Sequence, residues 1–212
     1  MDVFLDLDGT LTDNSIGIMA SVEHALTHLD EPVPSRKELL AWIGPPLKNS
    51  FQAHLGSEEK AARAIALYRE RYRETGLFEN EVYDGIPEMM DHLVARGARL
   101  HLATSKPRVF AERIVAHFGL DTRLSSVFGS ELDGHNSEKA ELLKYAKETL
   151  GVAGGIMLGD RCYDMTGALA ADCKAIGALW GFGSREELTD AGAHRLAGTP
   201  SEAATAIDEA LQ

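Results

Sequence analysis

The chain has 212 residues, of which 44% are hydrophobic and 25% charged, and its formal net charge is −12. This length allows one domain or a core with a smaller insertion, and the composition excludes a largely disordered chain. The acidic balance disfavours nucleic acid and anionic membranes as partners, whereas a bound divalent cation could still attract a small anionic substrate.

Two features of the sequence bear on the compartment. Cys162 and Cys173 are the only cysteines, which is too few for a secreted disulfide framework. Residues 1–13 lack a basic leader followed by a long apolar core, and the sequence contains no apolar run of 18 residues. We therefore expect a cytoplasmic protein with free thiols and no membrane segment.

The first predicted element is a strand that starts at Val3 and leads into two carboxylates, Asp6 and Asp8. Residues i and i+2 of a strand point to the same side, so both carboxylates are expected at the carboxyl end of this strand. Two such charges repel unless a cation or a shared proton intervenes, which favours a metal site. The alternative is that Asp8-Gly9 is only a turn and Asp6 a strand-end cap.

A helical segment follows, over residues 15–79. Apolar spacing predicts four helices here, interrupted at Gly44-Pro45-Pro46, because two prolines cannot continue a helix. Asn14 or Ser15 is expected to cap the first helix. The next strand begins only at Ala98, about 90 residues after the first, whereas a βαβ unit closes in roughly 30. The excess indicates a helical domain inserted into a core of residues 1–14 and 80–212.

The remainder alternates between helices and strands, which indicates an α/β fold with a doubly wound, mainly parallel sheet. Capping boxes are expected at Ser184 with Glu187 and at Thr199 with Glu202. The predicted helices cover 87–97, 107–118 and 137–150, one begins near Tyr163, and two more close the chain. The predicted strands cover 98–104, 126–128, 155–158 and 174–179.

Polar residues follow several of these strands. Thr104-Ser105-Lys106 ends the second strand, Asp160 and Asp164 follow the strand over 155–158, and Lys139 lies early in a helix. The carboxyl ends of parallel strands meet at one sheet edge, so this set predicts hard oxygen ligands for Mg²⁺ and cationic or hydroxyl donors for a phosphate. Taken singly, Thr104 could be an ordinary strand-end residue and Lys139 a surface lysine.

Four motifs in this order resemble those of the haloacid dehalogenase superfamily: Asp6-Leu7-Asp8-Gly9-Thr10, Thr104, Lys139, and Gly159-Asp160 through Asp164. The resemblance covers the whole chain and implies a Rossmann-like core with residues 15–79 as a helical cap domain. Three loop stretches further resemble the phosphoglycolate phosphatase and 5′-nucleotidase-like branch, namely Gly44-Pro45-Pro46-Leu47, residues 129–134 and residues 180–188.

The resemblance also implies roles for single residues. Asp6 would be the nucleophile that forms an aspartyl-phosphate, and Asp8 the general acid and then the general base. Mg²⁺ would bind the Asp6 carboxylate, the Asp8 backbone carbonyl and Asp160, with Asp164 in support. The phosphoryl oxygens would contact Thr104, Ser105 and Lys139. The implied activity is Mg²⁺-dependent hydrolysis of small phosphomonoesters, phosphoglycolate-like compounds or nucleoside monophosphates.

The break in the helical insert suggests a second contribution to substrate binding. Two prolines restrict the loop, which would present Gly44, Lys48 and backbone donors to a substrate when the insert closes as a lid. The alternative is a simple helix-breaking turn.

Two other functions remain open from the sequence. A sugar phosphomutase would use the same acid and base, although Thr10 is more typical of the phosphatases in this superfamily. A non-catalytic regulator on the same scaffold should have lost some of these polar residues, and none is missing here. We expect a monomer or weak homodimer acting on a small phosphorylated molecule.

Overall fold

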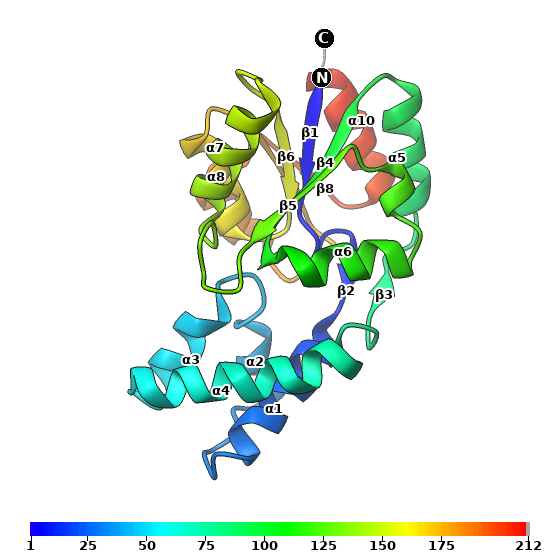
Figure 1. Ribbon diagram of the computed structural model, residues 1–212. Helices are drawn as coiled ribbons and strands as arrows, with labels where there is room; N and C mark the ends of the chain where they lie inside the picture. The colour runs from blue at the N-terminus through cyan, green and yellow to red at the C-terminus, as the bar shows by residue number, and fades with distance from the viewer. Residues whose placement is uncertain (211–212) are drawn as a thin grey trace. The chain divides into compact units, whose positions relative to one another are not determined.

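The computed structural model describes residues 1–210, shown in Figure 1. Residues 211 and 212, the end of the expected core, lie outside this range. The chain forms two compact units, one made of Met1–Thr12 with the chain from Val82 onward, the other of Asp13–Glu81. The chain passes from one unit to the other at two short strands that pair with each other, β2 (Thr12–Asp13) and β3 (Glu81–Val82).

The first unit is built on a parallel sheet. Within residues 1–210 this sheet has six strands in the order β5-β4-β1-β6-β7-β8, and every neighbouring pair is parallel. The strands are β1 (Asp2–Leu5), β4 (Arg99–Pro107), β5 (Ser126–Ser130), β6 (Ile156–Gly159), β7 (Lys174–Ala178) and β8 (Arg195–Ala197). The chain extends the sheet from β1 through β4 to β5, then returns to β6 on the other side of β1. This reversal makes the carboxyl end of β1 the switch point of the sheet.

Helices cover both faces of this sheet. In Figure 1, α5 and α10 lie on one face and α7 and α8 on the other, where Phe4, Met157, Leu142 and Met165 form part of a buried core. Burying each such side chain contributes about 1.5–3 kcal/mol. The doubly wound, mainly parallel α/β fold is thus confirmed. The helices are α5 (Ile86–Ala95), α6 (Arg108–His117), the short 3₁₀ helix η2 (Asp121–Arg123), α7 (Lys139–Leu150), α8 (Cys162–Ala170), α9 (Arg185–Asp190) and α10 (Pro200–Ala210).

Several element bounds differ from those expected. The sequence predicts no strand at β2, β3 or β8, because two or three residues are too few to show an alternating pattern. The helix expected from Ser137 begins at Lys139. At the two expected capping boxes, Ser184 and Thr199 accept from the backbone N–H groups of Glu187 and Glu202, but both glutamates bond elsewhere.

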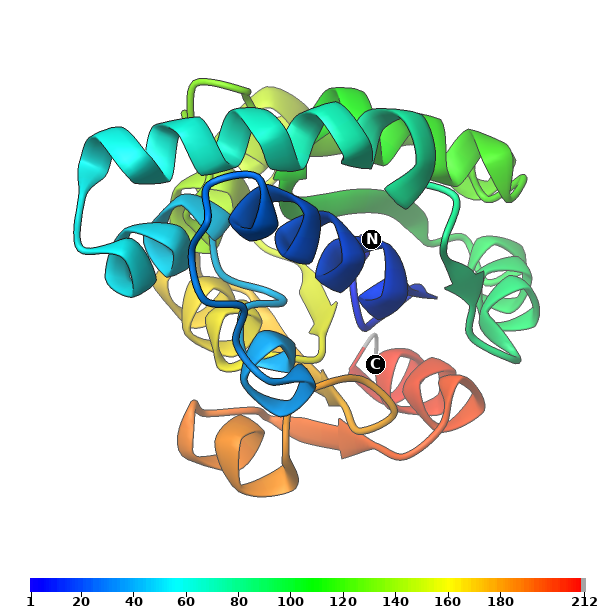
Figure 2. The ribbon, with the colours of Figure 1, turned by 90° about the horizontal axis from the view of Figure 1, so that it is seen from below.

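The second unit is helical. It consists of α1 (Ser15–Thr27), α2 (Arg36–Leu40), α3 (Leu47–Leu55), α4 (Glu58–Arg71) and the π-helix η1 (Tyr72–Gly76). Figure 2 shows α1 alongside α4. Tyr68 of α4 packs edge-on against Phe51 of α3. Asn14 occupies the cap position of α1 without a side-chain capping bond, and Ser15 N–H instead donates to Asp13 Oδ1 at 3.0 Å. In the described part of the chain, no helix combines the length and apolar character needed to cross a membrane.

Asp2 and His101 form a buried hydrogen-bonded pair at the amino ends of β1 and β4. His101 Nε2 donates to Asp2 Oδ1 at 3.0 Å, and Arg99 Nη2 lies 2.7 Å from the same oxygen. Burial holds the pKa of His101 below its usual value despite the neighbouring Asp2, so the folded protein keeps this ring neutral. For Asp2, burial opposes ionisation, but the bonds from His101 and Arg99 hold its pKa below the usual value.

This pair should make the folded protein acid-labile. The unfolded chain can protonate His101 below its ordinary pKa of about 6.5, while the folded chain resists protonation. The stability due to His101 is therefore complete above about pH 6.5 and falls as the pH drops below that value. We expect the melting temperature to fall between pH 7.5 and pH 5.5 by more in the wild type than in His101→Leu. Equal falls in both proteins would assign the pH dependence to other groups.

Candidate active site

The predicted carboxylates converge at the switch point of the sheet. Asp6 follows β1, and its backbone N–H donates to Leu158 O of β6 at 3.0 Å. Asp160 follows β6, and Asp164 lies in the first turn of α8. One carboxylate oxygen from each of Asp6, Asp160 and Asp164 lies within 4.8 Å of the other two, and all three residues are buried. Asp6 and two carboxylates more than 150 positions later in the sequence thus form one acidic cluster.

Lys139 supplies the cation of this cluster. Its Nζ lies 2.9 Å from Asp6 Oδ1 and 2.8 Å from Asp164 Oδ1, and it donates to Ala103 O at 2.8 Å. The side chain is fully buried, which by itself would lower its pKa, but Asp164 and Asp6 raise the pKa of the ammonium above its usual value. Lys139 is therefore charged at neutral pH. It is not a solvated surface lysine.

Asp160 is held by two donors. Thr10 Oγ1 donates to Asp160 Oδ1 at 3.0 Å, and the backbone N–H of Phe182 donates to Asp160 Oδ2 at 2.8 Å. Burial and then the neighbouring Asp164 and Asp6 raise the pKa of this carboxyl well above its usual value. Burial likewise raises the pKa of Asp164 to about 6, although Lys139 opposes the shift. Each shift reflects negative charge brought together away from water.

The donor set of this cluster fits a hard divalent cation. One ammonium cannot balance three carboxylates, and carboxylate oxygens are the ligands that Mg²⁺ prefers. Asp6 Oδ1 and Asp164 Oδ1 are buried and accept no hydrogen bond of regular geometry. Each forms only an ion pair with Lys139 Nζ. A divalent cation bound by these oxygens would relieve the repulsion that raises the two carboxyl pKa values.

Asp8 lies outside this group of three. Its carboxylate Oδ2 pairs with Lys106 Nζ at 2.8 Å, and both side chains are largely buried. The sequence pointed to Lys106 only as a possible phosphate neighbour. A shift in the register of β4 between Thr104 and Pro107 brings it here, since an irregular strand end re-aims its side chains.

Thr104 and Ser105 occupy the same irregular strand end. Thr104 is buried, and its Oγ1 accepts from the backbone N–H of Lys106 at 3.3 Å. Ser130 Oγ of β5 donates to Ser105 O at 2.8 Å. The backbone around the expected phosphate donors is therefore fixed by bonds within and between β4 and β5.

Comparison with known proteins agrees with this arrangement. A family model described as haloacid dehalogenase-like hydrolase matches residues 3–178. The chain belongs to this family. The matched range includes Asp6, Lys139, Asp160 and Asp164, so the whole acidic cluster lies within it.

Three proteins illustrate the range of similarity between this chain and known proteins. A 5′-nucleotidase of Pseudomonas aeruginosa is 45% identical over 88% of this chain and 86% of its own. A crystal structure of a predicted phosphatase from Clostridium acetobutylicum is 43% identical with a TM-score of 0.94, covering 98% of both chains. Tyrosine-protein kinase PtkA of Mycobacterium tuberculosis is 37% identical over 85% of this chain, which spans 62% of that protein. The prediction of a haloacid dehalogenase-like phosphatase is confirmed.

The two residues expected from the helical insert belong to the second unit. Gly44 has a φ of 111°, a backbone conformation that favours glycine, and it precedes the two prolines before α3. Lys48 is exposed, and its Nζ lies 3.5 Å from Glu58 Oε1. A substrate-binding role for these two residues stays a prediction.

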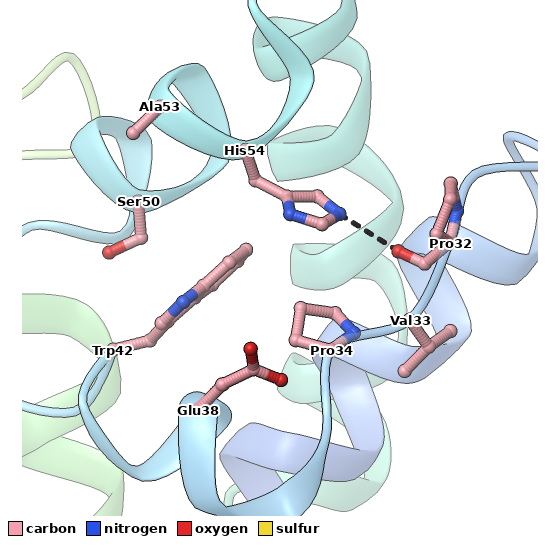
Figure 3. Close-up of a pocket in the computed structure, with 8 residues that line it drawn as sticks. All are labelled: Pro32, Val33, Pro34, Glu38, Trp42, Ser50, Ala53 and His54. Atoms are coloured by element: carbon pink, nitrogen blue, oxygen red, sulfur yellow. Dashed lines mark hydrogen bonds between the residues drawn. The ribbon is translucent and has the colours of Figure 1, made fainter.

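The second unit also contains a pocket of about 530 Å³, shown in Figure 3. Trp42, Pro34, Glu38 and His54 are among its walls. His54 Nε2 bonds to Pro32 O at 2.8 Å, and the Glu38 carboxylate accepts from Ser35 at the start of α2. His54 and Glu38 thus bond within the local fold, and the pocket is lined by none of the residues of the acidic cluster.

Sequence reasoning missed one carboxylate near the acidic cluster. Glu187 Oε1 accepts from the backbone N–H of Cys162 and from Arg161 Nε, each at 2.9 Å, and so holds the chain between Asp160 and Asp164. Its spacing from Ser184 suggested only a helix cap. Burial and Glu187 raise the pKa of the Cys162 thiol, which disfavours the reactive thiolate form.

Proposed function

We propose that this protein hydrolyses small phosphomonoesters in a Mg²⁺-dependent reaction through an aspartyl-phosphate on Asp6. The observation that carries the proposal is the buried cluster of Asp6, Asp160, Asp164 and Lys139 at the switch point of the sheet. A site of this charge suits a phosphoryl group once a divalent cation is bound, and phosphoryl transfer depends mainly on positioning and charge stabilisation.

The first half of the reaction uses Asp6 and Asp8. An Asp6 carboxylate oxygen attacks phosphorus, the bond to the ester oxygen breaks, and Asp8 gives its proton to the leaving alkoxide. Lys139, Thr104 and Ser105 bind the phosphoryl oxygens, where Mg²⁺ held by Asp6, Asp160 and Asp164 would supply further positive charge. In the second half, Asp8 takes a proton from water, the resulting hydroxide attacks phosphorus, and Asp6 is released with inorganic phosphate.

Within this class we rank nucleoside 5′-monophosphates above phosphoglycolate as substrates. The support is the relative named 5′-nucleotidase, which is 45% identical over most of both chains. The core residues recognise only the phosphate, so the leaving group must be selected elsewhere. We assign this selection to a cap domain of residues 15–79, with Gly44 and Lys48 as its contacts.

The proposal predicts that activity depends on a divalent cation. Turnover of p-nitrophenyl phosphate and of nucleoside 5′-monophosphates should vanish in EDTA and return on adding Mg²⁺, because Lys139 alone cannot balance the three carboxylates and the phosphate. Undiminished hydrolysis in EDTA would contradict the proposal.

Two further substrates distinguish hydrolysis from the activities of a phosphomutase and of a kinase. Hexose 1-phosphate should release phosphate and not isomerise, which distinguishes a hydrolase from a phosphomutase. ATP with a tyrosine peptide should give no phosphopeptide, although kinase activity is named for the relative PtkA. Isomerisation or peptide phosphorylation at rates above hydrolysis would overturn the assignment.

A further inference from the structure

The segment Trp180-Gly181-Phe182-Gly183 follows β7, and the proposed mechanism uses neither of its aromatic residues. Trp180 Nε1 donates to the backbone carbonyl of Thr10 at 2.9 Å, across 170 positions of sequence. The backbone N–H of Phe182 donates to Asp160 Oδ2 at 2.8 Å. This segment therefore contacts both Asp160 and the residue whose hydroxyl binds Asp160.

The two glycines let this segment lie directly against Asp160. A Cβ at Gly181 would come within 2.3 Å of Gly9 O and 2.4 Å of Asp160 Cβ. A Cβ at Gly183 would come within 2.0 Å of Asp160 O. Any side chain at either position would push the segment away, so the two glycines allow its backbone to lie against Asp160.

Thr10 links Trp180 to the carboxylate. The fully buried Thr10 donates its hydroxyl to Asp160 Oδ1, while its own carbonyl accepts from the indole of Trp180. An indole N–H is only a donor, and this carbonyl is its partner. The bond thus fixes the backbone from which the Thr10 hydroxyl projects.

We propose that Trp180 is a positioning residue for Asp160. Through Thr10 it holds the donor to Oδ1, while the neighbouring Phe182 N–H holds Oδ2. Together they keep a carboxylate oriented beside the like-charged Asp6 and Asp164. This inference rests on the proposed function, because it assigns Asp160 to divalent-cation binding. Partners that orient a metal ligand typically contribute 10- to 100-fold to metal affinity.

The test is direct titration of the metal-free 212-residue protein with Mn²⁺, in which electron paramagnetic resonance measures the free ion. Trp180→Phe removes the N–H and keeps an aromatic ring, so it should weaken Mn²⁺ binding by about 10-fold. Trp42→Phe is the matched control. It makes the same chemical change in the second unit and should bind Mn²⁺ like the wild type. Thermal melting of each variant checks that it is folded.

A second variant keeps the test decisive if Trp180→Phe does not fold. Thr10→Val removes only the hydroxyl, and it should weaken Mn²⁺ binding by about as much. The double variant should lose less than the product of the two single losses, because both act through Asp160. Wild-type affinity in Trp180→Phe, or full additivity with Thr10→Val, would overturn the positioning role alone. If the wild type bound no Mn²⁺, the proposed function would fail as well.

Discussion

Replacing Asp6 by asparagine is expected to reduce turnover of p-nitrophenyl phosphate by about 10⁴-fold or more, because an amide cannot form the acyl phosphate. The same change should not lower the melting temperature. Asp6 lies with two other buried carboxylates beside a single ammonium, so removing one negative charge relieves repulsion. Activity and thermal melting measured on the same preparation give the two readouts.

Asp8→Asn is the contrasting variant. Asp8 lies outside the acidic cluster, paired with Lys106, and its proposed role is proton transfer. Its loss should slow turnover by about 10²- to 10⁴-fold without abolishing it. Near wild-type rates for Asp6→Asn in independently purified preparations would rule out the covalent mechanism, whatever the result for Asp8→Asn.

Replacing Lys139 by methionine is expected to reduce both stability and activity. The change leaves Asp6 and Asp164 buried without their cation, and breaking a buried ion pair in this way costs about 3–5 kcal/mol. Turnover should fall by about 10²- to 10³-fold from the lost charge at the phosphoryl oxygens.

The stability loss in Lys139→Met should depend on pH with a definite sign. The pKa of Asp164 is already raised to about 6, and removing Lys139 raises it further. When a carboxyl has a higher pKa in the folded protein than in the unfolded chain, the folded protein becomes less stable as the pH rises from the unfolded pKa to the folded pKa. The deficit relative to the wild type should therefore be larger at pH 8 than at pH 5.

Urea unfolding in EDTA at pH 5 and pH 8 measures this difference. Lys147→Met is a matched control on the same helix, because Lys147 donates to the carbonyl of Ala171 and contacts no carboxylate of the cluster. Mg²⁺ should restore part of the stability of Lys139→Met by binding the folded state. Equal unfolding free energies for Lys139→Met and the wild type at pH 8 would contradict the role assigned to this lysine.

Local patterns in the sequence determined the fold class and the composition of the acidic cluster. Alternation of strands and helices is enough to predict a parallel sheet, whose carboxyl ends must share one edge. Asp6, Asp160 and Asp164 each follow or closely follow a strand, so their convergence could be predicted without coordinates. Strands of two or three residues could not be, because periodicity needs a longer segment.

The tertiary structure alone decided which side chains orient the cluster. Trp180 lies in a loop stretch that carried only a family resemblance, yet its indole N–H donates to the backbone carbonyl of Thr10. Lys106 pairs with Asp8, and Glu187 holds the start of α8. Each contact joins a loop or strand end to a distant part of the chain. The geometry of each contact depends on strand register and loop packing, which no local pattern predicts. The periodicity of strands and helices, by contrast, is visible in the spacing of neighbouring residues.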